Sequence, residues 1–290
     1  MKKEILSLKD VSYVYSYGTP FEHTALKAIN FTLQAGEFVG VIGHTGSGKS
    51  SFIQHLNGLL KPTTGQVFFE GKDIHAGKKG MRDLCFSVGL VFQYPEYQLF
   101  EETVEKDIAF GPNNMGLGQG EVASRVEVAA KLLGLTKEQL QMSPFLLSGG
   151  QKRRASMAGV LAMKPKVLVL DEPTAGLDPK GRKEILAHVK QYQEKEGAAV
   201  VMVSHNMDEI AAYADRVLVF SKASIVLEGT PAQVFGEEKI LVETGLLLPQ
   251  AMEIAAHLRK KGLPLSADIF TIEELAKEII SHSKQLKEDI

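Results

Sequence analysis

A stretch of eight residues, GHTGSGKS at 43–50, has the residue types and spacing needed to hold phosphate groups. Glycines let consecutive main-chain N–H groups point at phosphate oxygens without a Cβ in the way. The stretch lies between the apolar run FVGVI at 38–42 and a helix-forming segment, which is the strand–loop–helix setting that such a loop requires. We expect Lys49 to reach the β- and γ-phosphates of a nucleotide and Ser50 to offer its hydroxyl to Mg²⁺.

A pair of acids, Asp171 and Glu172, follows the apolar run VLVL at 167–170. Ligands of open α/β sheets lie at the carboxyl ends of the strands, and Mg²⁺ bound to a triphosphate prefers hard oxygen ligands. We therefore expect Asp171 to hold the metal through water. Glu172 is then placed to polarise the attacking water as a general base.

The segment LSGGQ at 147–151 resembles the signature of the ATP-binding cassette (ABC) transporters, and it ends 20 residues before Asp171. A helix-forming run follows it, and the N-terminal amides of a helix bind anions. The resemblance implies that this second anion site serves the γ-phosphate of ATP held by a partner subunit. Two subunits would then pair head to tail over two ATP molecules, and hydrolysis would remove the charge that bridges them.

Other residues match further motifs of the same family. Tyr15 resembles the aromatic residue that stacks on adenine; Tyr13 is the alternative, and packing within a sheet is a competing role. Gln93 resembles the glutamine that touches Mg²⁺ and water, and His205 resembles the histidine that contacts the γ-phosphate. The segment AGLD at 175–178 resembles the loop that follows the catalytic acid.

These motifs imply ATP and Mg²⁺ as cofactors and define three sets of site residues. The expected catalytic residues are Glu172, His205, Lys49 and Gln93. The expected metal ligands are Ser50, Gln93 and Asp171. The expected nucleotide-binding residues are Tyr15, Gly43, His44, Thr45, Gly46, Ser47, Gly48, Lys49, Ser50, Ser51, Ser148, Gly149, Gly150 and Gln151.

The run from Phe92 to Pro112, together with HLNGLLKPTTG at 55–65, resembles the ATPases of energy-coupling factor (ECF) transporters. The GHTGSGKS form of the phosphate loop favours the second of the two paired ATPases, although Ser51 stands where that loop is usually followed by threonine. The resemblance implies uptake of a vitamin or a transition-metal ion at the cytoplasmic face of the cell membrane. The implied partners are a second ATPase, a paralogue rather than a copy, a membrane coupling subunit and a substrate-binding membrane subunit.

Aromatic and aliphatic residues gather directly after Gln93, at Tyr94, Tyr97, Leu99 and Phe100. If exposed, they form an apolar patch suited to gripping a helix of another protein, and in the family this surface receives coupling helices of a membrane subunit. A local mini-core is the alternative.

The elements that must position these residues alternate between buried strands and helices, which predicts an α/β fold with a parallel core sheet. The resemblance makes this an ABC-type cassette of the P-loop NTPase class over residues 1–240. Alternating patterns in the first 35 residues and at 65–71 predict an antiparallel sheet, and residues 95–160 predict a helical lobe with a loop at 111–120. The expected buried strands are 38–42, 88–92, 167–170, 199–203 and 217–220.

The tail at 241–290 predicts a helical appendage. Ala251, Ile254, Ala255 and Leu258 have helical spacing. A capping box begins at Thr271 and is followed by a second stripe, Ile272, Leu275, Ala276 and Ile279. Packing on the main domain and contact with another subunit are both open.

Composition excludes several classes. The chain has 290 residues, 33 Lys and Arg against 35 Asp and Glu, and a net charge of −2, so no overall field favours nucleic acid or anionic lipid. No transmembrane segment and no signal peptide are evident, and we expect a cytoplasmic protein that meets the membrane only through partners. We expect Cys85 to be a buried apolar residue, and Lys152, Arg153 and Arg154 to form a solvated face.

Two other functions remain open. A cassette ATPase of DNA repair or of the ribosome would need a second cassette, a coiled-coil insertion or a basic arm, and none fits this chain. A regulatory subunit that binds ATP without cleaving it disagrees with the intact Glu172, His205 and LSGGQ.

Overall fold

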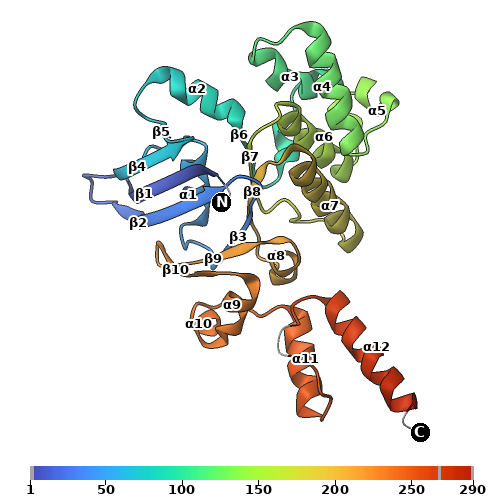
Figure 1. Cartoon of the computed structure of the whole chain (residues 1–290). Coiled ribbons are helices and arrows are strands. Elements are labelled where there is room, and N and C mark those ends of the chain that lie inside the picture. The colour runs from blue at the N-terminus through green and yellow to red at the C-terminus, as the bar shows by residue number, and fades with distance from the viewer. Residues whose placement is uncertain (1–2, 267–268, 289–290) are drawn as a thin grey trace. The chain divides into compact units, whose positions relative to one another are not determined.

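The computed structural model describes residues 3–266 and 269–288 (Figure 1). The chain divides into two compact units. The first holds the residues up to Glu37 together with Ser50–Val203, and the second holds Phe38–Lys49 together with the residues from Ser204 onward. Among the described residues, no helix has the length and apolar character needed to cross a membrane.

The first unit contains the predicted antiparallel sheet, in the order β2-β1-β4-β5. Its strands are β1 (Glu4–Tyr15), β2 (His23–Gln34), β4 (Thr64–Phe69) and β5 (Lys72–Asp73). Leu6, Leu8 and Val11 of β1 are buried, and β1 pairs with both β2 and β4. The predicted alternation is seen in β2, at Ile29, Phe31 and Leu33, whereas the start of β1 is covered on both faces, since every residue from Ile5 to Leu8 is buried.

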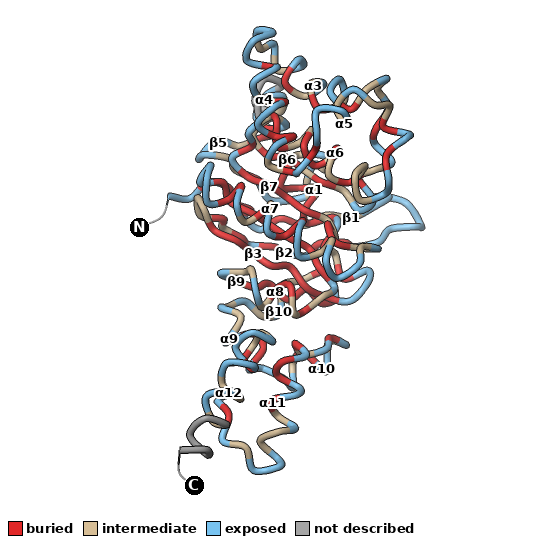
Figure 2. Tube along the Cα trace, turned by 90° about the vertical axis from the view of Figure 1, so that its right-hand side faces the viewer, coloured by how far each residue is buried: buried red, intermediate tan, exposed pale blue. Residues whose placement is uncertain are grey.

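Three strands of the same unit pair in parallel: β6 (Val88–Val91), β7 (Val167–Asp171) and β8 (Ala199–Val203). Val167 faces Val88 on one side and Ala199 on the other. All of β8, and β7 up to its last residue, is buried, and β7 lies among the red segments of Figure 2. The prediction of strands covered on both faces is confirmed.

Helices form the rest of the first unit, and four of them gather in the green part of Figure 1. These four are α3 (Val104–Asn114), α4 (Gln119–Leu132), α5 (Lys137–Gln141) and α6 (Gly149–Ala162). The others are α1 (Lys49–Leu56), which begins at the last residue of the second unit's first segment, α2 (Lys78–Ser87) and α7 (Pro179–Glu196). Residues 95–160 contain no strand, as predicted.

The loop predicted at 111–120 is wrong in its length, since α3 continues to Asn114 and α4 begins at Gln119. Gly111 lies so close to α6 that a Cβ there would come within 2.7 Å of the Met163 side chain. Pro112 lies inside the helix, two residues before its end, and leaves one main-chain hydrogen bond of the last turn unmade. Helix packing therefore overrides the turn-forming composition of this segment.

The second unit is built on β3 (Phe38–Gly43), which pairs in parallel with β9 (Arg216–Ser221); β10 (Ser224–Gly229) pairs with β9 in antiparallel fashion. Every residue of β3 is buried. The helices of this unit are α8 (Met207–Tyr213), α9 (Pro231–Gly236), α10 (Glu238–Glu243), α11 (Gln250–Lys260) and α12 (Ile272–Glu288).

The tail has a small core of its own, made by Ala251, Ala255, Leu265, Ile269 and Leu275. Its capping box forms as predicted, since the Glu274 N–H donates to Thr271 Oγ1 at 3.2 Å and the Thr271 N–H donates to Glu274 Oε2 at 3.0 Å. Helix α11 also packs on α8.

Three members of the predicted stripes, Ile254, Ile272 and Ala276, are exposed instead of buried. The tail thus packs within its own unit and still leaves apolar side chains at its surface.

Cys85 is exposed, so its predicted burial is wrong. The reason is helical geometry: the preceding residue, Leu84, is fully buried on α2, and the next position is turned about 100° away from that face.

His55 on α1 is fully buried. Its Nδ1 lies 2.7 Å from the Ser51 carbonyl oxygen, and the Tyr13 ring packs edge-on at 4.9 Å between centroids. Burial lowers the His55 pKa, the Ser51 carbonyl opposes this shift, and the charge of His75 adds to it. The folded chain therefore disfavours protonation of this imidazole.

We expect Leu275→Ala to loosen α11 and α12, because it empties the centre of the tail core at a cost of about 2–5 kcal/mol. Hydrogen exchange of the amides in both helices should accelerate. Ile272→Ala, on the exposed side of the same helix, is the matched control and should leave exchange unchanged. Equal effects of the two variants would contradict the packing described.

The lowered pKa of His55 predicts that stability falls as the pH drops below about 6.5, because unfolding then takes up a proton that the folded chain excludes. The loss is at most about 1.4 kcal/mol per pH unit. Urea unfolding of the native chain and of His55→Gln at pH 5.5 and 7.5 measures it. The variant should show the shallower pH dependence, and identical slopes would refute the prediction.

Candidate active site

The phosphate loop begins at Gly43, at the end of β3, with φ of 154°. A Cβ at this position would lie 2.4 Å from the Phe220 carbonyl oxygen and 2.7 Å from Ser47 Oγ. Only glycine combines this conformation with this close approach. Beyond it, His44, Thr45 and Gly46 are exposed, so the loop presents its main chain at the surface.

Lys49 closes the loop on itself. Its Nζ donates to the carbonyl oxygens of Gly43 at 2.6 Å and His44 at 2.9 Å. The side chain is buried, so two carbonyl dipoles stabilise its charge beside the loop. A cation is thereby positioned next to a turn of exposed main chain, as phosphate binding requires. Ser50 follows at the start of α1 and is exposed.

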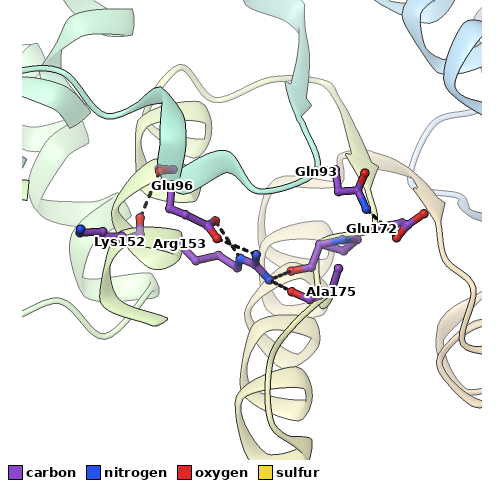
Figure 3. A network of polar contacts seen from close by, with 8 residues as sticks. Gln93, Glu96, Lys152, Arg153, Glu172 and Ala175 are labelled. Carbon is purple, nitrogen blue, oxygen red and sulfur yellow. Dashed lines mark hydrogen bonds and ion pairs between the residues drawn. The ribbon is translucent and has the colours of Figure 1, made fainter. Parts of the chain in front are cut away.

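The first unit brings Gln93 and Glu172 together. Gln93 follows β6 and Glu172 follows β7, which are neighbouring parallel strands, and Gln93 Nε2 donates to Glu172 Oε2 at 3.0 Å (Figure 3). The Glu172 backbone turns into the left-handed region, with φ of 48°, and its N–H donates to the Val203 carbonyl. Asp171 is the last residue of β7, opposite Val203 of β8.

Ser148 caps α6, the helix that begins within the LSGGQ segment. Its hydroxyl accepts from the Gln151 N–H at 3.4 Å, and its own N–H donates to Gln151 Oε1 at 2.8 Å. Because the hydroxyl accepts in this capping box, its proton remains available to donate to an anion. The first turn of α6, with Gly149 and Gly150, also has N–H groups without intrahelical partners.

Tyr15, at the end of β1, is the more exposed of the two candidate tyrosines. Its hydroxyl lies 3.1 Å from Ser51 Oγ, and the rings of Tyr13 and Tyr15 meet edge to face at 4.8 Å. Tyr13 contacts His55 as well, which places it in the packed part of the sheet. Ser51, which stands where threonine is usual, is buried, and its hydroxyl takes part in this contact with Tyr15.

His205 lies in the second unit, exposed in the turn between β8 and α8. The residues around it are held firmly: Ser204 Oγ donates to Glu209 Oε2 at 2.9 Å, and Asn206 caps α8. The imidazole therefore projects from an anchored turn. The phosphate loop up to Lys49 belongs to the same unit.

Ser50, Asp171 and Gln93 offer a hydroxyl, a carboxylate and an amide oxygen, which is the hard donor set that Mg²⁺ prefers. Within 3–266 and 269–288, no three histidine, cysteine or acidic side chains form a cage for a metal. Mg²⁺ that binds together with nucleotide phosphates takes only one or two carboxylates and keeps several waters. These residues therefore fit the ion.

The predicted solvent exposure of Arg153 is wrong. We expected it on a solvated face, yet it is 2% exposed and bonds to Glu96 and to the segment after Glu172. Its acidic partner lies 57 residues earlier in the chain, so helix periodicity carries no signal of this pairing. Glu96 itself was part of the run at 92–112 but was not singled out.

Comparison with known proteins shows the family of this chain. Residues 26–175 match the family model described as ABC transporter. The chain is 52% identical over 97% of its length to the energy-coupling factor transporter ATP-binding protein EcfA2 of Caldanaerobacter subterraneus subsp. tengcongensis, covering 99% of that protein. It is 51% identical over 95% of its length to the EcfA2 of Clostridium perfringens, of which it covers 96%.

Solved structures are similar too. CbiO1 of Clostridium perfringens, described as part of the ABC transporter complex cbiONQ, superposes with a TM-score of 0.75 at 39% identity, covering 89% of this chain and all of that one. The ATP-binding cassette MJ0796, a dimer bound to ADP and phosphate, has a TM-score of 0.70 at 27% identity over 78% of this chain and 99% of its own. The chain therefore belongs to the ABC transporter family and, within it, to the ATP-hydrolysing, ATP-binding subunits of energy-coupling factor transporters named EcfA2.

Proposed function

We propose that the chain hydrolyses ATP at this site to drive uptake of a vitamin or a transition-metal ion through membrane subunits. The observation that carries the catalytic part is the Gln93–Glu172 contact at the ends of two neighbouring strands. The Gln93 amide orients the Glu172 carboxylate. In a chain that also has a phosphate loop, a carboxylate oriented in this way is suited to activating the water that attacks the γ-phosphate.

The site residues divide the work of hydrolysis. Lys49 and the main-chain amides of the phosphate loop hold the β- and γ-phosphates. Glu172 accepts a proton from the attacking water, and the Gln93 amide keeps its carboxylate oriented. His205 contacts the γ-phosphate from its anchored turn, and the exposed ring of Tyr15 stacks on adenine.

Mg²⁺ fits Ser50, Asp171 and Gln93, and when bound it neutralises charge that develops on the phosphates. The chain contributes the oxygen ligands at the strand ends and at the start of α1. Ser51 supports Tyr15 through their hydroxyl contact rather than through the metal.

A head-to-tail pair accounts for the second anion site. Ser148 can donate its hydroxyl proton while its oxygen accepts from Gln151, and the start of α6 adds partial positive charge. We infer that this site holds the γ-phosphate of ATP on a partner ATPase, a paralogue rather than a copy. The exposed Ile254, Ile272 and Ile280 make the appendage at 241–290 suited to the same pairing, beyond the cassette at 1–240.

A hollow beside the Gln93 segment suits a helix of a membrane subunit. Its volume is about 410 Å³, and Leu99, Phe100 and Phe110 are among the residues that line it. The rings of Phe100 and Phe110 meet at 5.0 Å, and the two side chains are 58% and 46% exposed. Leu99 is buried, which agrees with the alternative of a local mini-core. The exposed rings of Phe100 and Phe110 favour the docking of another protein. Such docking would hold the chain at the cytoplasmic face of the cell membrane.

We expect Glu172→Gln to keep ATP binding and to lose turnover by at least about 100-fold, because the amide cannot accept a proton. Phosphate release and binding of a fluorescent ATP analogue measure the two separately. Glu184→Gln on α7 is a control that removes one exposed carboxylate. Full hydrolysis by Glu172→Gln would refute the water-activation role, and a wild-type complex without turnover would favour a regulatory subunit.

We expect Phe100→Asp to abolish co-purification with the membrane subunits while the chain still binds ATP, because a charge then enters an apolar contact. Phe21→Asp changes an equally large, exposed ring that does not line the hollow, so it should co-purify normally. Affinity purification from solubilised membranes, followed by mass spectrometry, reads out both. Retained partners in Phe100→Asp would contradict the docking surface.

A further inference from the structure

We propose that Arg153 is a positioning residue for ATP hydrolysis, which ties helix α6 to the segments that carry Gln93 and Glu172. The inference rests on the proposed function, since it concerns the same catalytic site. It assigns a role to a side chain that lies outside every motif named above.

All three nitrogens of the Arg153 guanidinium donate hydrogen bonds to other protein groups (Figure 3). Nε donates to Glu96 Oε2 at 3.2 Å and one terminal nitrogen donates to Glu96 Oε1 at 3.0 Å, which makes a two-pronged ion pair. The other terminal nitrogen donates to the Pro173 carbonyl at 3.3 Å and to the Ala175 carbonyl. The planar fork of arginine suits this arrangement, and lysine cannot reproduce it.

The partners of Arg153 flank the two catalytic residues. Glu96 lies in the short helix Pro95–Gln98, three residues after Gln93. Pro173 directly follows Glu172, and Ala175 lies two residues further on. One side chain from α6 therefore holds both segments immediately beyond the Gln93–Glu172 contact.

Both held segments begin at a strained backbone corner. Tyr94 and Glu172 have φ of 56° and 48°, in the left-handed region that residues with a side chain rarely adopt. Such conformations persist where the surroundings determine them. Val203 holds the Glu172 N–H, and Arg153 holds the carbonyls just beyond it. The Tyr94 ring also lies 6.0 Å from the Arg153 guanidinium.

Burial makes these contacts interdependent. Because Arg153 is only 2% exposed, water hardly solvates its charge. Glu96 and the two carbonyl groups must stabilise that charge instead. Removal of one partner from such a pair leaves a buried charge uncompensated. The arrangement thus favours a single relative placement of α6 and the two segments.

Helix α6 also begins within the LSGGQ segment. Its N-cap, Ser148, lies five residues before Arg153. In the proposed pair, that end of α6 meets ATP on the partner, whereas Glu172 acts on the chain's own ATP. Movement of the helix start would reach Glu172 through the Arg153 contacts. Arg153 is therefore expected to support cooperativity between the two sites as well as the rate.

The test uses the full-length chain in the transporter complex and measures phosphate release, ATP-analogue binding and melting temperature. We expect Arg153→Gln to lower kcat by about 100-fold, as misplacement of a catalytic group by about 1 Å does, while the KM for ATP changes by less than about threefold. The Hill coefficient should fall towards one. Arg153→Lys should not restore kcat, because the fork is lost.

Glu96→Gln is the milder change, because its amide oxygen can still accept a hydrogen bond from Arg153 and the Glu96 side chain is partly exposed, and it should lower kcat by about tenfold. The double variant should be no slower than Arg153→Gln alone, since both act through one contact. The matched control is Arg125→Gln. Arg125 also bonds to a glutamate, Glu121, and to a carbonyl, that of Met163, but touches neither catalytic segment. It should lower the melting temperature and leave kcat unchanged.

Arg153→Gln or Glu96→Gln with native kcat and Hill coefficient would overturn the inference, as would an equal loss of kcat in Arg125→Gln. A wild-type complex that binds ATP without turnover would overturn the proposed function, and the positioning role with it. Additive losses in the double variant would show that the two residues act separately, which also contradicts the proposal.

Discussion

Burial of the parallel strands on both faces is the constraint on which the chemistry of this chain depends. Strands β3, β7 and β8 have almost no surface on which a polar side chain could lie in water. Polar groups can enter only where a strand ends. The phosphate loop follows β3, Gln93 follows β6, Asp171 ends β7 and His205 follows β8. Reactive groups are thus concentrated at strand ends because the strands exclude them elsewhere.

The same constraint explains why candidate site residues could be picked out from the sequence. In the sequence, a buried strand can be recognised as a short, continuous apolar run. The first polar residue after that run marks its end. Asp171 and Glu172 were assigned on that ground, and the ABC family with its phosphate loop and LSGGQ segment was recognised from local motifs. The capping box at Thr271 was also readable because its two members lie three residues apart.

What the sequence could not reveal depends on contacts between distant residues. Gly111 and Pro112 are turn formers by composition, yet they are helical where α3 packs against Met163. Arg153 has two charged neighbours in sequence, so its pattern is that of a solvated face, and only folding brings Glu96 to it. Ile254 and Ile272 fit apolar stripes, but the tail core closes on Leu265 and Ile269 from the connecting segment instead. Periodicity identifies helices, whereas it cannot say which neighbours cover them.

The charge of α6 supports a role for Arg153 beyond helix stability. The first turn of this helix contains no acidic residue, and Lys152, Arg153 and Arg154 follow it directly. Positive charge near a helix N-terminus opposes the macrodipole and destabilises the helix. Glu96 offsets part of this cost, but an apolar residue at 153 would avoid both the burial of charge and the unfavourable dipole. Contacts with Glu96 and with the carbonyls beyond Glu172 are what an apolar residue could not supply, and they account for an arginine at this position.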